Sequence, residues 1–193
     1  MLLFKNKKDL TDEQLMQGVC EGDAACFGII YDRYADKMMR YFYRMLGQNV
    51  TRAEDFTQDI FTKLIEKPNL FDTGKKFSTW LYAVALNMCK NEYRRLEVRR
   101  NTLNEEPHPN KTRDMDSDNF VDRIDKKTFL KMLDVELGLL DEKHRTTFLL
   151  RYQEEMSIKE ISEVLGISEG TIKSRLFYTL RKLSEKLKVF DLN

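Results

Sequence analysis

The residues best suited to chemistry near the C-terminus are basic, short polar and aromatic side chains on one predicted helix. Residues 171–188 hold six Lys or Arg residues and one acid. Helical spacing predicts one buried apolar stripe, made of Ile172, Leu176, Leu180, Leu183 and Leu187. The opposite face then carries Thr171, Ser174, Tyr178 and Arg181, flanked by Lys173, Arg175, Phe177 and Lys182. Such a face suits duplex DNA, because Lys and Arg bind phosphates while polar and aromatic side chains contact base edges. The alternative is an ordinary amphipathic helix with a solvated charged face.

A second stretch, residues 71–100, mixes aromatic with basic side chains. Residues 75–100 carry seven Lys or Arg residues and two acids, and the aromatic residues of the stretch are Phe71, Phe77, Trp80, Tyr82 and Tyr93. Aromatic faces stack on unpaired bases and basic groups follow the backbone, as a single-strand binding surface requires. The same aromatic residues could instead be core beside a solvated basic tail, and the residues alone leave both interpretations open. Trp80, the one tryptophan, could serve in both roles.

Other kinds of chemistry find little support. The three cysteines, Cys20, Cys26 and Cys89, form no CxxC pair, and there are only two histidines. Neither a metal site nor another cofactor is therefore expected. No phosphate-binding GxxxxGK(S/T), HExxH or GxSxG pattern occurs. We expect a protein that is not an enzyme and has no small-molecule substrate.

The elements that must position these side chains are predicted to be helices. Glycine and proline are scarce, at 8 and 3 of 193 residues, and helix-forming residues are abundant. Capping boxes are expected at Thr11, Thr51 and Ser157, and single helix caps at Ser78, Asp141 and Ser168. No strand-like alternation is present. The expected fold class is all-α.

Composition divides the chain into two small helical domains. Residues 101–117 contain two prolines and almost no large apolar side chain, so they are predicted to form a flexible linker. The linker separates an N-terminal domain, residues 10–100, from a C-terminal domain, residues 118–190. In the latter, two capped helices joined by Gly166-Ile167-Ser168 predict a helix-turn-helix. The chain has 33 basic and 32 acidic residues, so any DNA-binding surface must be local.

The N-terminus gives no sign of export. MLLFKNKKDL lacks the apolar stretch of a signal peptide, and no run approaches the ~20 apolar residues of a membrane span. Sparse, odd-numbered cysteines also fit a reducing compartment. We expect a soluble, cytoplasmic protein.

Three stretches resemble bacterial RNA polymerase sigma factors of the extracytoplasmic-function (ECF) type. Residues 77–95, FSTWLYAVALNMCKNEYRR, are similar to that family's FxxWLYxIAxNxxxDxxR stretch. Residues 53–61, AEDFTQDIF, are similar to its AEDxxQExF. Arg151-Tyr152 and residues 157–183 resemble its LRY and helix-turn-helix stretches. The resemblance covers almost all of residues 10–190 in order, with the linker in place.

The resemblance implies a protein that binds core RNA polymerase, recognises two promoter DNA elements and helps to open the DNA. It implies core polymerase binding by Asp55, Gln58 and Asp59, whose spacing puts them on one helix face. It implies minus-ten binding and melting by the N-terminal domain, through Asn69, Lys75, Trp80, Asn87, Lys90 and Arg94. It implies minus-thirty-five recognition by the C-terminal domain, through Thr171, Lys173, Ser174, Arg175, Phe177, Tyr178 and Arg181. An anti-sigma factor, often membrane-bound in this family, is a further expected partner.

Some residues depart from the family's pattern or allow another interpretation. Asn91 stands where the family usually has Asp, and Tyr178 stands where a basic residue is common, so the preferred minus-thirty-five sequence stays open. Acids in a first helical turn, such as Asp55, also stabilise the helix itself. The rival function is a transcription regulator of the response-regulator output type, which has a similar helix-turn-helix. That rival leaves residues 50–100 unexplained.

Overall fold

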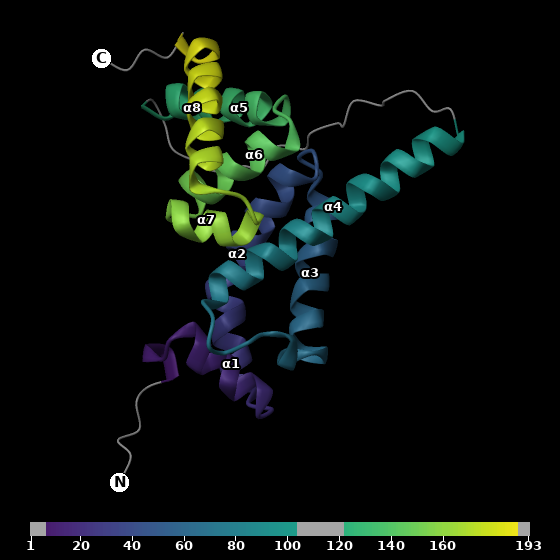
Figure 1. The fold of residues 1–193 in the computed structure, drawn as a ribbon, viewed down its shortest axis with the longest axis vertical. Coiled ribbons are helices and arrows are strands. Elements are labelled where there is room, and N and C mark those ends of the chain that lie inside the picture. The colour runs from purple at the N-terminus through teal and green to yellow at the C-terminus, as the bar shows by residue number, and fades with distance from the viewer. Residues whose placement is uncertain (1–6, 104–121, 189–193) are drawn as a thin grey trace. The chain divides into compact units, whose positions relative to one another are not determined.

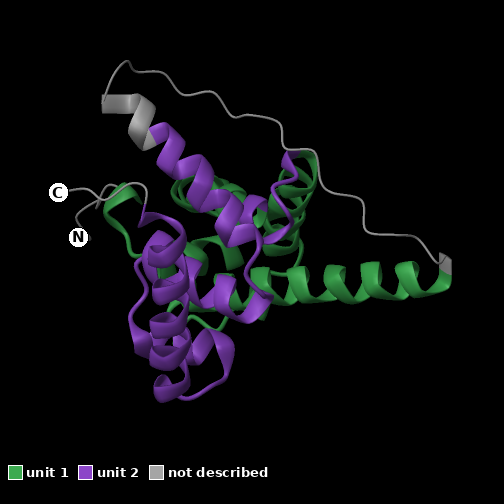
Figure 2. Cartoon of the chain, turned by 90° about the horizontal axis from the view of Figure 1, so that it is seen from above, with its two compact units in different colours: residues 1–42, 51–107 green, residues 43–50, 108–193 purple. Residues whose placement is uncertain are grey.

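The computed structural model describes residues 7–103 and 122–188, and every regular element in these ranges is a helix (Figure 1). The predicted all-α fold class is therefore confirmed. The chain divides into two compact units, one of residues 1–42 with 51–107 and one of residues 43–50 with 108–193 (Figure 2). The predicted linker lies outside the described residues, except for its first three residues, which belong to a helix.

The described part of the first unit consists of helices around one core. Its elements are the 3-10 segment η1 (Lys7–Asp9), α1 (Asp12–Cys20), α2 (Ala24–Met45, continuing into the second unit), α3 (Val50–Glu66), the 3-10 segment η2 (Pro68–Leu70) and α4 (Phe77–Leu103). Large side chains without solvent contact fill the core, among them Leu15, Met16, Ile30, Met38, Tyr41, Phe77 and Leu81. Because α1 packs against both η2 and α4, it braces the chain on either side of the loop that joins α3 to α4.

The described part of the second unit contains the helix-turn-helix. Its helices are α5 (Asp122–Gly138), α6 (Glu142–Phe148), the π-helical segment η3 (Leu149–Gln153), α7 (Ile158–Leu165) and α8 (Glu169–Lys186). α8 packs against α5, α6 and α7. This contact buries Ile172, Leu176, Thr179 and Leu183 and leaves one side of α8 exposed.

Most of the predicted helix caps are confirmed, and two are wrong. Observed caps are Thr11, Asp141, Ser157 and Ser168, each accepting a hydrogen bond from a backbone N–H in the first turn. Thr51 and Ser78 are not caps, since α3 begins at Val50 and α4 at Phe77. α3 thus begins two residues before the start that a Thr51 cap would give, directly after a turn in which Gly47 and Gln48 are left-handed (φ 72° and 61°). At α4 the cap comes from another helix, as described below.

Candidate nucleic-acid interface

Local capping at both ends of α7 builds the helix-turn-helix. The Glu160 N–H donates to Ser157 Oγ at 3.2 Å, and the Ser157 N–H donates to Glu160 Oε2 at 2.7 Å. Gly166 ends α7 in the left-handed conformation (φ 64°), which glycine adopts without steric cost. Ser168 then begins α8 by accepting from the Thr171 N–H at 3.2 Å. The predicted helix-turn-helix is confirmed.

The exposed surface of α8 carries most of the residues predicted to contact duplex DNA. Thr171, Lys173, Ser174, Phe177, Tyr178 and Arg181 are exposed, and Arg175 is half-buried. Leu180 does not join the buried stripe: it is 41% exposed, and Thr179, 1% exposed, takes the buried position. Burial of Thr179 is possible because its hydroxyl donates to the Arg175 carbonyl at 2.7 Å.

The interactions among the exposed α8 side chains are local. Lys173 Nζ lies 4.0 Å from Glu169 Oε2, and Arg181 Nε lies 3.4 Å from Glu185 Oε1. Such exposed helical ion pairs contribute only about 0.3–0.5 kcal/mol, so a DNA phosphate can replace them. The rings of Phe177 and Tyr178, 62% and 60% exposed, meet edge-on with centroids 5.5 Å apart. Apolar ring surface beside basic groups suits contact with base edges in a groove.

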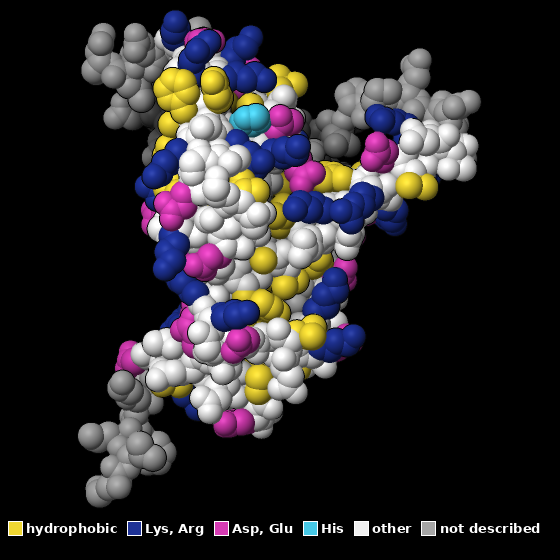
Figure 3. Space-filling view, viewed as in Figure 1, with side chains coloured by type: hydrophobic (Ala, Val, Ile, Leu, Met, Phe, Trp, Pro, Cys, Tyr) yellow, Lys and Arg dark blue, Asp and Glu magenta, His cyan; other side chains and the backbone are white. Residues whose placement is uncertain are grey.

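One face of α4 carries the residues predicted to contact the minus-ten strand. Asn87 and Arg94 are exposed and Lys90 is half-buried, and their spacing of three and four residues aligns them along the helix. The opposite side is core, with Leu81, Tyr82, Ala85, Leu86 and Cys89 buried. Lys and Arg side chains lie along the visible surface of α4 (Figure 3). The structure therefore brings these three predicted residues together on a basic surface.

The aromatic residues of 71–100 are divided between core and surface. Phe71, Phe77 and Tyr82 are 3%, 0% and 2% exposed, which leaves no face for a base. Trp80 is half-buried, with its ring centroid 5.4 Å from that of Phe71 and 5.9 Å from that of Phe77. Three of the aromatic residues thus belong to the core, whereas Trp80 packs on the core and keeps accessible surface.

The loop between α3 and α4 holds the other two predicted minus-ten residues. Phe71 anchors it, with its ring centroid 5.3 Å from that of Phe77. Asp72 Oδ1 accepts from the Gly74 N–H at 3.0 Å, and the Asp72 carbonyl accepts from the Lys75 N–H at 2.9 Å. Asn69 and Lys75 are exposed, and Lys75 Nζ lies 3.9 Å from Asp72 Oδ2. The exposed residues thus lie on either side of a buried anchor.

The α3 face predicted to bind polymerase is exposed as a group. Asp55, Gln58 and Asp59 all reach solvent. The buried side of α3 is formed by Ala53, Ile60, Phe61 and Leu64. The three polar residues are therefore not needed for packing and are available to a partner.

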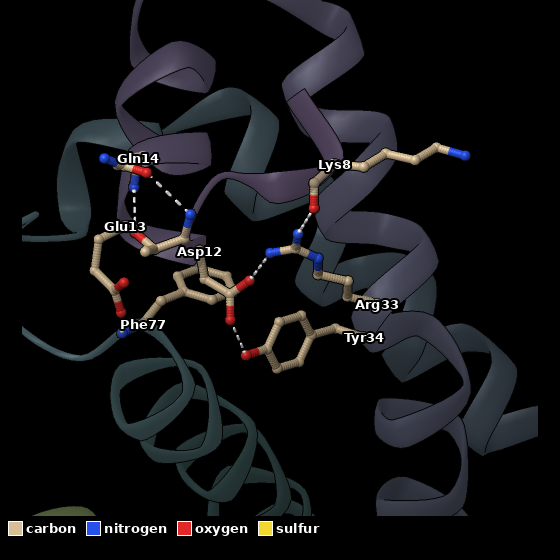
Figure 4. A network of polar contacts seen from close by, with 8 residues as sticks. Lys8, Asp12, Glu13, Gln14, Arg33, Tyr34 and Phe77 are labelled. Carbon is tan, nitrogen blue, oxygen red and sulfur yellow. Dashed lines mark hydrogen bonds and ion pairs between the residues drawn. The ribbon is translucent and has the colours of Figure 1, made fainter. Parts of the chain in front are cut away.

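A polar network that the sequence did not reveal fixes α1 against α2 (Figure 4). Asp12 accepts from Arg33 Nη1 at 2.6 Å and from the Tyr34 hydroxyl at 2.5 Å. Arg33 Nη2 also donates to the Lys8 carbonyl at 2.6 Å. Burial, followed by the hydrogen bond to Asp12, raises the pKa of Tyr34 well above its usual value, so Tyr34 remains a neutral donor.

Two further long-range contacts involve α4. The backbone N–H of Phe77 donates to Glu13 Oε1 of α1 at 2.9 Å. The Glu92 carboxylate, 6% exposed, accepts from Arg52 of α3, and from Arg95 Nε and Nη2 at 2.8 and 2.9 Å. No local pattern signals partners that are 64 and 40 residues apart.

The described ranges contain neither a metal-binding cluster nor a membrane-spanning helix. No three His, Cys, Asp or Glu side chains there gather into a group that could hold a metal ion. No helix within 7–103 or 122–188 combines the length and apolar character that crossing a membrane requires.

Comparison with known proteins accounts for both halves of the chain. The Sigma-70 region 2 family model matches residues 30–99, which include α3 and most of α4, and the Sigma-70 region 4 model matches residues 130–183, which include the helix-turn-helix. The two matches define a transcription initiation factor of the sigma-70 class.

Individual relatives narrow the class. The chain is 33% identical over 176 residues to the ECF RNA polymerase sigma factor SigW of Bacillus subtilis, covering 88% of this chain and 93% of SigW. It is 29% identical over 171 residues to the ECF RNA polymerase sigma factor SigL of Mycobacterium tuberculosis, covering 87% and 92%. The fold is also that of the sigma factor RpoE from Bartonella quintana, solved in complex with the anti-sigma factor NepR (TM-score 0.73, 20% identity, 84% of this chain and 97% of RpoE).

The chain belongs to the ECF RNA polymerase sigma factors. It directs RNA polymerase to promoters and acts in transcription initiation. The response-regulator alternative is not favoured, because the region 2 match covers the N-terminal residues which that alternative leaves unexplained.

Proposed function

We propose that this sigma factor works through three separate surfaces. The α3 face of Asp55, Gln58 and Asp59 binds core polymerase. The loop Asn69–Phe77 and the α4 face of Asn87, Lys90 and Arg94 bind the minus-ten strand. The exposed face of α8 reads the minus-thirty-five element. The residues 10–100, 101–117 and 118–190 then act as melting domain, linker and minus-thirty-five domain.

The observation that carries the proposal is the arrangement around the start of α4. An exposed loop bearing Asn69 and Lys75 leads directly into the helix whose polar face holds Asn87, Lys90 and Arg94. Extruding a base from duplex DNA costs a few kcal/mol, and stacking or pocketing a base returns about 1–3 kcal/mol. A surface of this kind can therefore favour the unpaired strand over the duplex.

Promoter opening tests the strand-binding surface. In vitro transcription with core polymerase over genomic fragments first identifies the promoters, with start sites mapped. Lys75→Ala combined with Asn87→Ala should then reduce open-complex formation on duplex promoters. If the lost step is melting itself, the defect should shrink on promoters with a pre-melted minus-ten bubble. Lys37→Ala on α2 removes the same charge elsewhere and is the control. Full opening by the double variant would refute the proposal.

Holoenzyme assembly tests the α3 face. Asp55→Lys with Asp59→Lys should weaken competition for core polymerase while leaving helicity and melting temperature nearly unchanged, because both side chains are exposed. Glu163→Lys, an exposed reversal on α7, is the control. Unaltered competition by the double variant would remove the α3 face from the proposal.

An anti-sigma factor is the regulatory partner that we propose. The relative RpoE was solved with the anti-sigma factor NepR, which supports a partner of this kind for a chain of the same fold. If residues 101–117 act as a hinge, labels in the two domains should give a broad distance distribution in the free protein. Core polymerase or the inhibitor should narrow it. A single narrow distance in the free protein would contradict the hinge.

The proposed activity requires binding alone. Promoter selection and strand separation use interaction free energy, so we expect no catalytic residue, cofactor or small-molecule substrate. Since polymerase and promoter DNA are its partners, the cytoplasm is the proposed site of action.

A further inference from the structure

The last residue of the loop Asn69–Phe77 is hydrogen-bonded to a side chain of another helix, α1. Glu13, in the first turn of α1, directs its carboxylate at the first residue of α4 and accepts the Phe77 N–H at 2.9 Å (Figure 4). The first N–H groups of a helix have no partner within the helix, and a carboxylate near them is stabilised by the helix dipole. Glu13 therefore performs for α4 the capping that Ser78 does not.

This contact completes a set of constraints on the loop. At the entry, η2 packs against α1. In the middle, Phe71 is buried against Phe77 and Trp80. At the exit, the Phe77 N–H is held by Glu13. Asn69 and Lys75 are two of the exposed residues of this loop, and these contacts with α1 help to fix where they lie.

Direct contact between Glu13 and DNA is unfavourable. A carboxylate repels phosphate, and Glu13 is half-buried beneath the end of the loop. It also takes the place at the N-terminus of α4 where an anion would otherwise bind. Any effect of Glu13 on the strand must therefore act through the backbone of Phe77.

We propose that Glu13 is a positioning residue for capture of the unpaired minus-ten strand: from α1 it fixes the end of the loop that presents Lys75 and the start of the helix that presents Asn87. The inference rests on the proposed function of that loop. Asp12, its neighbour, instead accepts hydrogen bonds from Arg33 and Tyr34 of α2 (Figure 4). The adjacent carboxylates thus separate two tasks, one holding α1 to α2 and the other holding the loop to α1.

The test measures binding of a labelled single-stranded oligonucleotide, carrying the non-template minus-ten sequence of a mapped promoter, to reconstituted holoenzyme. Glu13→Ala should weaken binding about tenfold. Glu13→Gln should restore most of it, because an amide oxygen also accepts the Phe77 N–H. Asp12→Ala is the matched control, since it removes the neighbouring carboxylate but keeps the Glu13–Phe77 hydrogen bond and the packing of α1 against η2 and α4, and it should bind the strand almost normally.

A second measurement uses Trp80 in the free full-length chain. The Trp80 ring packs on Phe71 and Phe77, so quenching of its fluorescence by acrylamide reports how well this packing is kept where the loop joins α4. Glu13→Ala should raise this quenching, while Glu13→Gln and Asp12→Ala should leave it near the original value.

The outcomes separate the inference from the proposed function. Suppose that Lys75→Ala with Asn87→Ala binds the strand weakly, as the proposed function requires. The positioning role is then overturned if Glu13→Ala binds the strand normally, or if Asp12→Ala loses as much binding as Glu13→Ala. If that double variant binds the strand like the unaltered protein, the proposed function fails and the positioning role fails with it.

Discussion

Glu92 offers the sharpest test of what holds α4 to α3. Its carboxylate is 6% exposed and accepts hydrogen bonds from Arg52 and Arg95. Glu92→Ala removes the carboxylate to which Arg52 and Arg95 donate. Removing one member of a fully buried ion pair costs about 3–5 kcal/mol, whereas a hydrogen bond to a charged group contributes about 1.5–3 kcal/mol. The side chains of Arg52 and Arg95 are 27% and 73% exposed and can regain water, which favours the lower range.

We therefore expect Glu92→Ala to lower the free energy of unfolding of the N-terminal unit by about 2 kcal/mol. For a domain of 60–100 residues, about 1 kcal/mol shifts the melting temperature by roughly 4–8 °C, so the expected drop is about 8–16 °C. Thermal unfolding followed by circular dichroism measures it. Glu97→Ala, at an exposed position on the same helix, is the control and should change the melting temperature little.

High salt sharpens the same test. Exposed ion pairs are screened by salt, whereas buried pairs are screened much less. The loss in Glu92→Ala should therefore persist in concentrated salt. A loss no greater than that of Glu97→Ala, or one abolished by salt, would show that Glu92 acts as a surface charge and that the α3–α4 contact does not depend on it.

Four further predictions follow from single residues. Ser157→Ala should destabilise the second unit by about 1 kcal/mol in thermal unfolding, because it removes the capping box of α7. Because the pKa of Tyr34 is raised in the folded state, Tyr34 contributes stability that is complete below pH 10.0, the ordinary pKa of tyrosine, and that falls as the pH rises above 10.0. Tyr34→Phe should therefore reduce the fall in melting temperature at alkaline pH, as measured by thermal unfolding over a pH series. Arg181→Ala should reduce the slope of log K against log salt for duplex promoter binding by about 0.9 if Arg181 contacts one phosphate. Tyr178→Ala should lose discrimination between thymine and deoxyuracil at one minus-thirty-five position if its ring contacts the thymine methyl group, as paired binding titrations would show.

Sequence reasoning succeeded where the determinants are local. The Ser157–Glu160 box and the left-handed Gly166 depend on residues within one turn of each other, and both are observed. It failed at Thr51 and Ser78, where polar residues of the right type follow a helix start that was fixed elsewhere. It also wrongly predicted that Leu180 is buried, where the structure buries Thr179. Helical spacing is compatible with either residue, and packing against the neighbouring helices determines which one is buried.

The candidate site shows the same division. The family resemblance named Asn87, Lys90 and Arg94 as minus-ten residues, and the structure aligns them along one face of α4. Spacing could not decide whether Phe71 and Phe77 stack on bases or form core, since their burial depends on residues far away in sequence, such as Tyr34 of α2, whose ring packs on Phe77. Glu13 lies within the Thr11 capping box, which gives no sign of its contact with the loop, because that contact requires the tertiary fold.

The bond between Glu13 and Phe77 also bears on the order in which a newly made chain can fold. It spans 64 residues, and at about 5–20 residues per second a ribosome needs about 3–13 s to synthesise that interval. Throughout this time α1 and α2 lack part of the surface against which they pack. The capping bonds of α7, by contrast, each span three residues and can form as soon as the segment emerges. Closure of α1 onto the start of α4 is thus a late event in the synthesis of the N-terminal unit, whereas the α7 cap needs only residues of its own turn.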